Sequence, residues 1–275
     1  MEPVATTEAL RLVLKQALDP LVALVLGASR AIGILLILPV LTRAQVAALL
    51  RTAVALALAL PVLGHTSAAI AQLGGRPDRA LQIVLIAIKE VGVGALIGFL
   101  LGTPFWTIQI VGELIDMQRS IVNSVQSSDL ASGSEATVLN SLLWFVAIVV
   151  FIASDGLGIV VRTLYESYSV WPLVRFLPSI SLDGVYALVG LLDHMLRQAF
   201  LIAGPAVVLL LLVDLSVMLI GRFTPSLNVS DLAPTIKNIA FIVFMLLYAG
   251  YLLNYVGAEV AGTRGVTEEL EGVVQ

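Results

Sequence analysis

The sequence predicts an all-α protein that crosses the membrane several times. Of its 275 residues, 59% are hydrophobic and 12% are charged, whereas a soluble domain is about 45–50% apolar and about 25% charged. The mean hydropathy of +1.02 agrees with that composition. A backbone inside lipid must satisfy its own hydrogen bonds, and a helix does so within one segment. We therefore expect the apolar runs to be helices.

Six apolar runs are candidates for membrane spans, which need about 20 residues each. They are Pro20–Leu41, Val46–Leu63, Leu81–Gly102, Leu139–Ala153, Gln198–Gly221 and Ile236–Val256. The second and the fourth are short for a full span. Because the runs are evenly spread, we expect one domain over 1–275. Its parts are a hydrophobic hairpin (1–80), a middle part (81–153), C-terminal helices (154–257) and an acidic tail (258–275).

Several functional classes are disfavoured by composition. The net charge of −4 argues against a nucleic-acid partner, and the absence of cysteine excludes disulfides and thiolate sites. Glu2 and Glu8 stand where a signal peptide would carry basic residues, so we expect an uncleaved first helix. His65 and His194 are isolated from any metal-ligand or protease motif. We expect no enzyme and no cofactor.

The orientation in the membrane is not fixed by charge. With six alternating spans, the lysines and arginines divide almost equally between the two sides. The positive-inside rule then cannot choose an orientation. Either the topology is unconventional or the number of spans differs from six.

The third run carries glycines at every fourth position, Gly94, Gly98 and Gly102. Glycines at this spacing share one helix face, which lets another backbone approach closely. The partner is either a helix of this chain or another subunit.

Ionisable residues within or at the start of apolar runs form a second signal: Lys89, Glu90, Arg30 and Asp214. A charge in lipid is costly, so these side chains are expected to face protein or water. Pairing at helix–helix or subunit contacts is favoured over a substrate or proton pathway.

After the third run, Thr107–Ser127 has the pattern of an amphipathic helix. Its polar positions are Gln109, Glu113, Asp116, Ser120, Asn123 and Ser127, and its apolar positions are Ile108, Val111, Ile115, Val122 and Val125. Such a helix lies in the membrane interface, or it lines or plugs an aqueous path. The periodicity leaves both alternatives open.

Four blocks of residues resemble the type III secretion export proteins called SctT, HrcT, YscT or SpaR, and their flagellar relative FliR. The first is Lys89–Gly102, and the second is GELIDMQR at Gly112–Arg119, followed by a polar turn at Ser128 and Asp129. The third is FIASDGLG at Phe151–Gly158. The fourth contains Gly204, Pro205, Asp214, GRFTPSLNV at Gly221–Val229, Pro234 and Lys237. Ser120, Ser226 and the missing histidine near Gly156 depart from the family pattern.

The resemblance implies a non-enzymatic T-type subunit of the export apparatus. Such a subunit assembles with R-type and S-type subunits into a conical helical complex around a secretion channel in the bacterial inner membrane. Its long helical hairpins depart from a normal spanning topology. U-type and V-type subunits join at the cytoplasmic side, and unfolded substrates pass through. A small-solute permease that uses Lys89, Glu90 and Asp214 is the alternative function.

Two sets of site residues follow. We expect a channel plug within Gly112–Ser134, with Met117, Ile121, Val125, Ser128 and Asp129 as its gate residues. Methionine suits this role because its unbranched side chain adapts its packing. We expect subunit contacts from the charged, glycine and loop residues of the four blocks: Lys89, Glu90, Gly94, Gly98, Gly102, Glu113, Asp116, Arg119, Asp214, Arg222, Pro225, Asn228 and Lys237.

Overall fold

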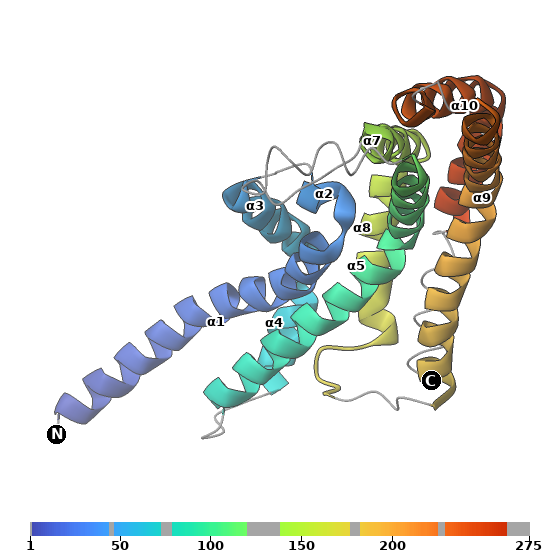
Figure 1. Cartoon of the computed structure of the whole chain (residues 1–275). Helices are drawn as coiled ribbons and strands as arrows, with labels where there is room; N and C mark the ends of the chain where they lie inside the picture. The colour runs from blue at the N-terminus through green and yellow to red at the C-terminus, as the bar shows by residue number, and fades with distance from the viewer. Residues whose placement is uncertain are drawn as a thin grey trace. The chain divides into compact units, whose positions relative to one another are not determined.

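The computed structural model describes residues 2–43, 47–72, 79–119, 138–176, 182–224 and 229–262. Within these residues the regular structure is helical and no strand occurs (Figure 1). The helices are α1 (Glu2–Ile37), α2 (Pro39–Arg43), α3 (Ala48–Ala59), the 3-10 turn η1 (Leu60–Val62), α4 (Leu63–Gln72), α5 (Arg79–Gln118), α7 (Val138–Ala153), α8 (Gly156–Val170), α9 (Leu182–Phe223) and α10 (Val229–Gly262). The prediction of an all-α polytopic membrane protein is confirmed.

Five helical segments are long and apolar enough to cross a membrane, and each overlaps a predicted run. They are Leu18–Ile37, Ala48–Gln72, Arg79–Gln118, Leu188–Phe223 and Ala233–Glu259. The remaining run, Leu139–Ala153, is short because α7 and α8 are separated by a sharp bend. Together these two helices form a broken span or a re-entrant loop.

Helix α5 differs from the prediction of an apolar helix followed by a separate amphipathic one. It runs without a break for 40 residues, with Pro104 in its interior. A proline removes one backbone hydrogen bond, which neighbouring groups in a membrane protein compensate. At 1.5 Å per residue α5 is about 60 Å long, twice the roughly 30 Å of hydrocarbon in a bilayer. The predicted amphipathic segment is therefore the second half of a long helix, as far as Gln118.

The chain forms two compact units. The first contains Met1–Gly102, Leu157–Ala187 and Arg264–Gln275, and the second contains Thr103–Gly156 and Leu188–Thr263. The predicted parts of the chain, with boundaries after 80, 153 and 257, stay a prediction.

The core of the first unit is formed by apolar faces of α1, α5 and α8. Its largest fully buried apolar side chains include Leu26 and Ile34 of α1, Ile97 and Leu100 of α5, and Leu164 of α8. Burying a side chain of this size stabilises a fold by about 1.5–3 kcal/mol. Helix α1 also packs against α3 and α4.

Aromatic packing organises the second unit next to the bend that ends α7. The ring centroid of Phe105 in α5 lies 5.4 Å from that of Trp144 and 5.3 Å from that of Phe151, both in α7. At the bend, Asp155 adopts φ 60°, a left-handed conformation that is uncommon outside glycine. The next position requires glycine, because a Cβ at Gly156 would overlap the ring of Phe151.

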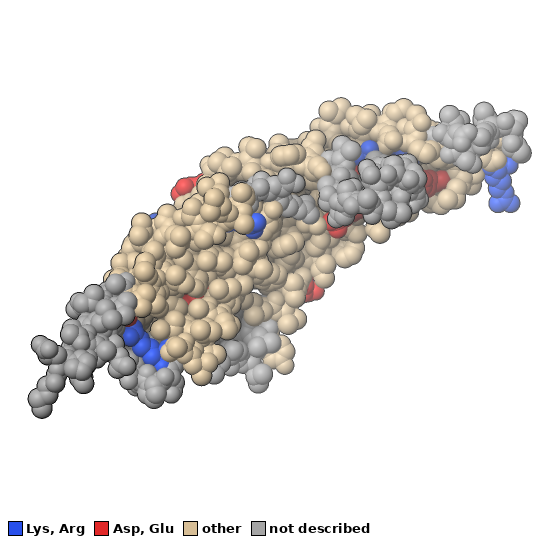
Figure 2. Space-filling view, turned by 90° about the vertical axis from the view of Figure 1, so that its left-hand side faces the viewer, with Lys and Arg blue, Asp and Glu red and all other residues tan. Residues whose placement is uncertain are grey.

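Helices α9 and α10 expose many large apolar side chains. On α10, Leu246 is 78% exposed and Leu247 is 83% exposed. Charged side chains are sparse on the face of the molecule drawn in Figure 2. Surfaces of this kind are stable in lipid or against other proteins, and not in water.

Candidate functional site

A buried charge cluster lies in the first unit, and we call it the Arg30 cluster. It comprises Arg30 of α1, Lys89 and Glu90 of α5, Ser167 of α8, and Trp171, which follows α8. The side chains of Arg30 and Glu90 are fully buried, and that of Lys89 is 7% exposed. Arg30 Nε donates to Glu90 Oε2 at 2.6 Å, and Lys89 Nζ lies 2.7 Å from Glu90 Oε1. One carboxylate therefore joins two cations.

The other donors of Arg30 are also used within the first unit. Nη1 donates to Ser167 Oγ at 2.9 Å, and Nη2 donates to the carbonyl of Trp171 at 2.8 Å. The guanidinium carbon lies 4.0 Å from the ring centroid of Tyr168. A buried guanidinium needs partners for its N–H groups, and these contacts supply them from α5 and from the region of α8.

Glycines bring α1 and α5 together beside this cluster. A Cβ at Gly94 would overlap the carbonyl of Arg30, and a Cβ at Gly98 would lie 2.9 Å from the carbonyl oxygen of Ile34. Gly33 stands opposite, where a Cβ would overlap the carbonyl of Val91. Gly102 is also buried. The expected close backbone approach thus occurs inside this chain, while a role of the three predicted glycines at a subunit interface stays a prediction.

A second cluster lies in the second unit, and we call it the Asp116 cluster. It comprises Asp116 and Arg119 at the end of α5, Asn140 of α7 and Asn238 of α10. Asp116, which is fully buried, lies 3.2 Å from Arg119 Nη1 through Oδ1. Its Oδ2 accepts a hydrogen bond of 3.2 Å from the backbone N–H of Asn140. Arg119 Nη2 donates to Asn238 Oδ1 at 2.9 Å. The cluster joins three helices.

The position of Asp116 explains why its carboxylate is buried. The N–H groups of a helix's first turn have no partner within the helix and attract negative charge. Asn140 lies in the first turn of α7, so Asp116 satisfies one of these groups. Gly112 permits the approach, because a Cβ there would lie 2.8 Å from the Cα of Asn140.

Helices α9 and α10 are joined by an ion pair whose lysine, Lys237, is the sequence neighbour of Asn238 in the Asp116 cluster. Lys237 Nζ lies 2.6 Å from Asp214 Oδ1, and Lys237 also donates to the carbonyl of Gln118 at 3.2 Å. The amide of Gln118 donates to Asp214 Oδ2 at 3.3 Å. The predicted residues Asp116, Arg119, Asp214 and Lys237 are thus brought together at the end of α5.

Other predicted site residues are not part of these clusters. Glu113 is exposed and accepts a hydrogen bond of 2.7 Å from Gln109. Arg222 is exposed in the last turn of α9. Met117 is 71% exposed. Ile121, Val125, Ser128, Asp129, Pro225 and Asn228 lie outside the described residues.

Sequence reasoning missed several polar partners. Ser167, Asn140 and Asn238 contact charged side chains that are far away in the sequence. Asn140 and Asn238 are polar residues within apolar runs, which does not identify a partner, and Ser167 lies outside the runs and gives no signal. Arg30 was recognised as an unusual charge in such a run, and its ion pair with Glu90 confirms the expected pairing at a helix–helix contact.

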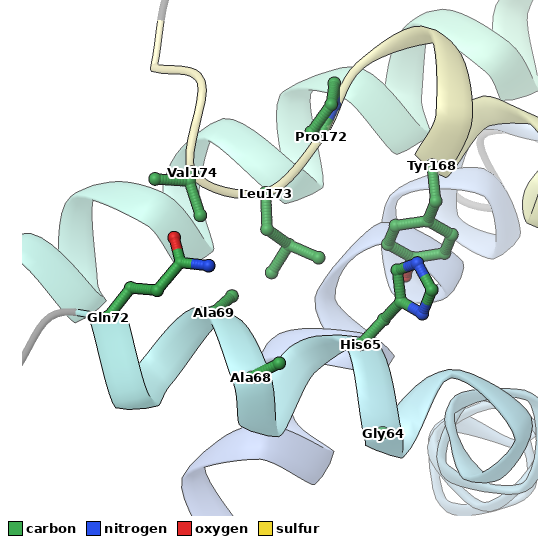
Figure 3. A pocket seen from close by; sticks show the side chains of 9 residues that line it. All are labelled: Gly64, His65, Ala68, Ala69, Gln72, Tyr168, Pro172, Leu173 and Val174. Carbon is green, nitrogen blue, oxygen red and sulfur yellow. The ribbon is translucent and has the colours of Figure 1, made fainter.

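A groove of about 250 Å³ opens in the first unit between α4 and the segment that follows α8 (Figure 3). The imidazole of His65 lies beside the ring of Tyr168, and Gln72 lies toward Val174. The Tyr168 hydroxyl donates to the carbonyl of Gly27 at 3.0 Å. The lining is completed by Gly64, Ala68, Ala69, Pro172 and Leu173. These groups offer apolar contact and no nucleophile–base arrangement. Among the described residues, no three histidine, aspartate or glutamate side chains are grouped to hold a metal ion.

Comparison with known proteins gives a consistent result. The sequence model described as "Bacterial export proteins, family 1" matches residues 21–262. The "Yop proteins translocation protein T" of Yersinia pestis is 30% identical over 238 residues, which are 86% of this chain and 89% of that protein. The "Surface presentation of antigens protein SpaR" of Salmonella typhimurium is 30% identical over 81% of each chain. The "Flagellar biosynthetic protein FliR" of Bacillus subtilis is 25% identical over 59% of this chain and 63% of its own length.

Proposed function

The chain belongs to the family of bacterial export proteins, family 1, and on that premise we propose that it is the T-type subunit of a type III secretion export apparatus. The observation that carries this proposal is the match of the family over residues 21–262, together with a relative named as a translocation protein for Yop proteins. The protein acts without enzymatic chemistry. It assembles with R-type and S-type subunits into a conical complex around a channel for unfolded substrates in the inner membrane. U-type and V-type subunits join this complex.

Helix length supports a setting partly inside a protein assembly. Helices α5 and α9 have 40 and 42 residues, so each extends about 60 Å and exceeds one hydrocarbon thickness. Exposed apolar side chains along α9 and α10 then need partner subunits wherever lipid does not cover them.

The charge clusters weigh against the small-solute permease. That alternative requires Lys89, Glu90 and Asp214 to line one substrate site. Lys89 pairs with Glu90 at 2.7 Å, and Asp214 pairs with Lys237 at 2.6 Å. Charges already paired in this way serve to fix helices and are not free to bind a solute.

We place the channel plug in Gly112–Ser134. Met117 is the one proposed gate residue that is described, and its 71% exposure leaves the thioether available for a neighbouring subunit or the channel. The Asp116 cluster supports this proposal because its hydrogen bond between Arg119 and Asn238 anchors the chain just before the rest of the proposed plug. The remaining gate residues, Ile121, Val125, Ser128 and Asp129, follow in the sequence.

Deleting Ser127–Ser134 tests the plug. The assembled complex should then leak small ions, because the barrier loses eight residues while the charge clusters that hold the helices remain. Ion conductance of membranes that contain the complex measures this. Removing the eight residues Val266–Val273 is a matched control that should leave conductance low. Unchanged conductance after the first deletion, with the complex assembled, would refute the plug.

Replacing Arg222 by glutamate tests the predicted assembly contact at the end of α9. The exposed guanidinium is expected to contact an R-type or S-type subunit, so reversing its charge should prevent co-purification. Arg197→Glu is the control, since Arg197 lies on the same helix and is 70% exposed. A normal complex from Arg222→Glu would remove Arg222 from the interface.

Reconstituting the chain alone tests the permease alternative directly. An export subunit should catalyse no saturable uptake of small solutes into liposomes, whereas a permease should. Co-expression with R-type and S-type subunits, followed by electron microscopy, tests the assembly. Saturable uptake by the isolated chain would overturn the proposed function.

A further inference from the structure

The ammonium group of Lys89 lies in a cradle of oxygen atoms. Glu90 Oε1 is 2.7 Å away, the carbonyl oxygen of Leu173 is 2.9 Å away, and those of Pro172 and Arg175 are each 3.3 Å away. A lysine ammonium has three N–H donors. Three of these four acceptors are backbone carbonyls of one short turn, so a single cation holds the turn's backbone together.

The turn, Trp171–Arg175, is also held by Arg30, which donates to the carbonyl of Trp171 at 2.8 Å, and by Leu173, which is 5% exposed. It follows the last residue of α8 and contains no regular helix. The indole Nε1 of Trp171 donates to the carbonyl of Arg175 at 3.0 Å, and the amide of Arg175 donates to the carbonyl of Pro172 at 3.1 Å. Val174 is 49% exposed, so it adds little packing. Without Lys89, the carbonyl of Leu173 would lose its hydrogen bond, and the carbonyls of Pro172 and Arg175 would keep only the bonds from the Arg175 amide and the Trp171 indole.

The charge balance of the Arg30 cluster fits this role. Two cations, Arg30 and Lys89, share the single carboxylate of Glu90. The second positive charge is compensated by the carbonyl-rich end of α8 and the turn beyond it, since helix C-termini carry partial negative charge and attract cations. Arg30 has a different set of partners, because its Nε, Nη1 and Nη2 donate to Glu90, Ser167 and the carbonyl of Trp171.

We propose that Lys89 is a resident cation that positions the Trp171–Arg175 turn, and that the cradle left by its removal binds a free primary alkylammonium ion. The Lys89 ammonium thus occupies the position of a bound monovalent cation and is held there by its covalent link to α5. This role lies within the first unit and does not depend on the export function.

Lys89→Ala tests the proposal, because n-propylammonium has the atoms that the substitution removes. Trp171 reports on the turn, since Lys89 Nζ lies 5.9 Å from its ring centroid. The protein has three tryptophans, so the test uses a Trp106→Phe, Trp144→Phe background. In detergent, Lys89→Ala should shift the Trp171 emission to the red, and added n-propylammonium should reverse that shift with a saturable dependence.

Two controls separate a cradle from a general salt effect. Tetramethylammonium carries the same charge without an N–H donor, so at equal concentration its effect should be about tenfold smaller. Lys237→Ala, which removes the buried lysine of the second unit, should not make Trp171 emission sensitive to the amine. Equal effects of the two ammonium ions, or an unshifted emission in Lys89→Ala, would overturn the proposal.

A second route covers the case in which Lys89→Ala does not fold. The chain has no cysteine, so Lys89→Cys introduces a unique thiol that 2-bromoethylamine converts into a side chain ending in an ammonium group. Aminoethylated protein should regain the emission of the parent, and protein capped with a neutral group of similar length should not. Recovery with both groups would also contradict a cation-specific cradle.

Discussion

Adding one methyl group at Gly94 should force α1 and α5 apart. A Cβ at this position would overlap the carbonyl of Arg30 and would lie 3.0 Å from the Cα of Gly33. These atoms belong to the backbone of α1, so no side-chain rotation can relieve the overlap. Glu90 lies one turn earlier on α5, and separating the helices would stretch its ion pair with Arg30.

The expected cost combines two effects. Overpacking a tight contact costs about 1–3 kcal/mol, and breaking a buried ion pair costs about 3–5 kcal/mol. Because the helices can separate without losing the ion pair entirely, we expect Gly94→Ala to lower the free energy of unfolding by about 3–5 kcal/mol. For a chain of this size, that lowers the Tm by roughly 6–20 °C.

Gly92→Ala is the matched control on the same helix. A Cβ at Gly92 meets nothing within 4 Å, and alanine is favoured over glycine in a helix interior by about 1 kcal/mol. Thermal unfolding of both proteins in a mild detergent, followed by circular dichroism, measures the difference. If Gly94→Ala melts at the same temperature as Gly92→Ala, the close approach of α1 and α5 is wrong.

Three further predictions concern the second unit. Asp214→Asn should destabilise the protein by about 3 kcal/mol because the nearly buried Lys237 loses its counter-ion. The double variant Asp214→Leu, Lys237→Met should recover most of that loss, and equal Tm values for the single and double variants would contradict this. Asp116→Asn should speed hydrogen exchange at the start of α7, where Asn140 loses a charged acceptor; unchanged protection there would show that Asp116 does not cap the helix. Met117→Ala should change stability by less than about 0.5 kcal/mol, since the side chain is 71% exposed, yet it should raise ion leakage through the assembled complex. An unchanged leak would remove Met117 from the plug.

The glycine face shows what periodicity can and cannot predict. Positions Gly94 and Gly98 follow from spacing alone, because a period of four marks one face of a helix. Gly33, which lies opposite Gly94, has no glycine four residues away in the predicted first run and gives no such signal. To predict which two helix faces pack together, one must know the path of the chain between the helices, and the spacing of residues does not give that path.

Asp116 shows a second limit. Its spacing from Gln109 and Glu113 places it on the polar face of the helix, and those two neighbours are indeed partly or fully exposed. Asp116 is nevertheless fully buried, because the first turn of α7 and Arg119 surround it. Helical periodicity predicts the direction in which a side chain leaves the helix axis. Whether that side chain is buried depends on which other segments of the chain pack against it.

The two ion pairs between α1 and α5 constrain how these helices can change in length. Asp19 pairs with Arg79 at 2.5 Å, and Arg30 pairs with Glu90 at 2.6 Å. In each helix the two charged residues are eleven positions apart, close to three full turns of 3.6 residues. One residue inserted between Arg79 and Glu90 would rotate part of α5 by about 100° and separate at least one pair. We therefore expect an insertion or deletion to be rejected between the two pairs, and to be tolerated before Asp19, where it changes the spacing of neither pair.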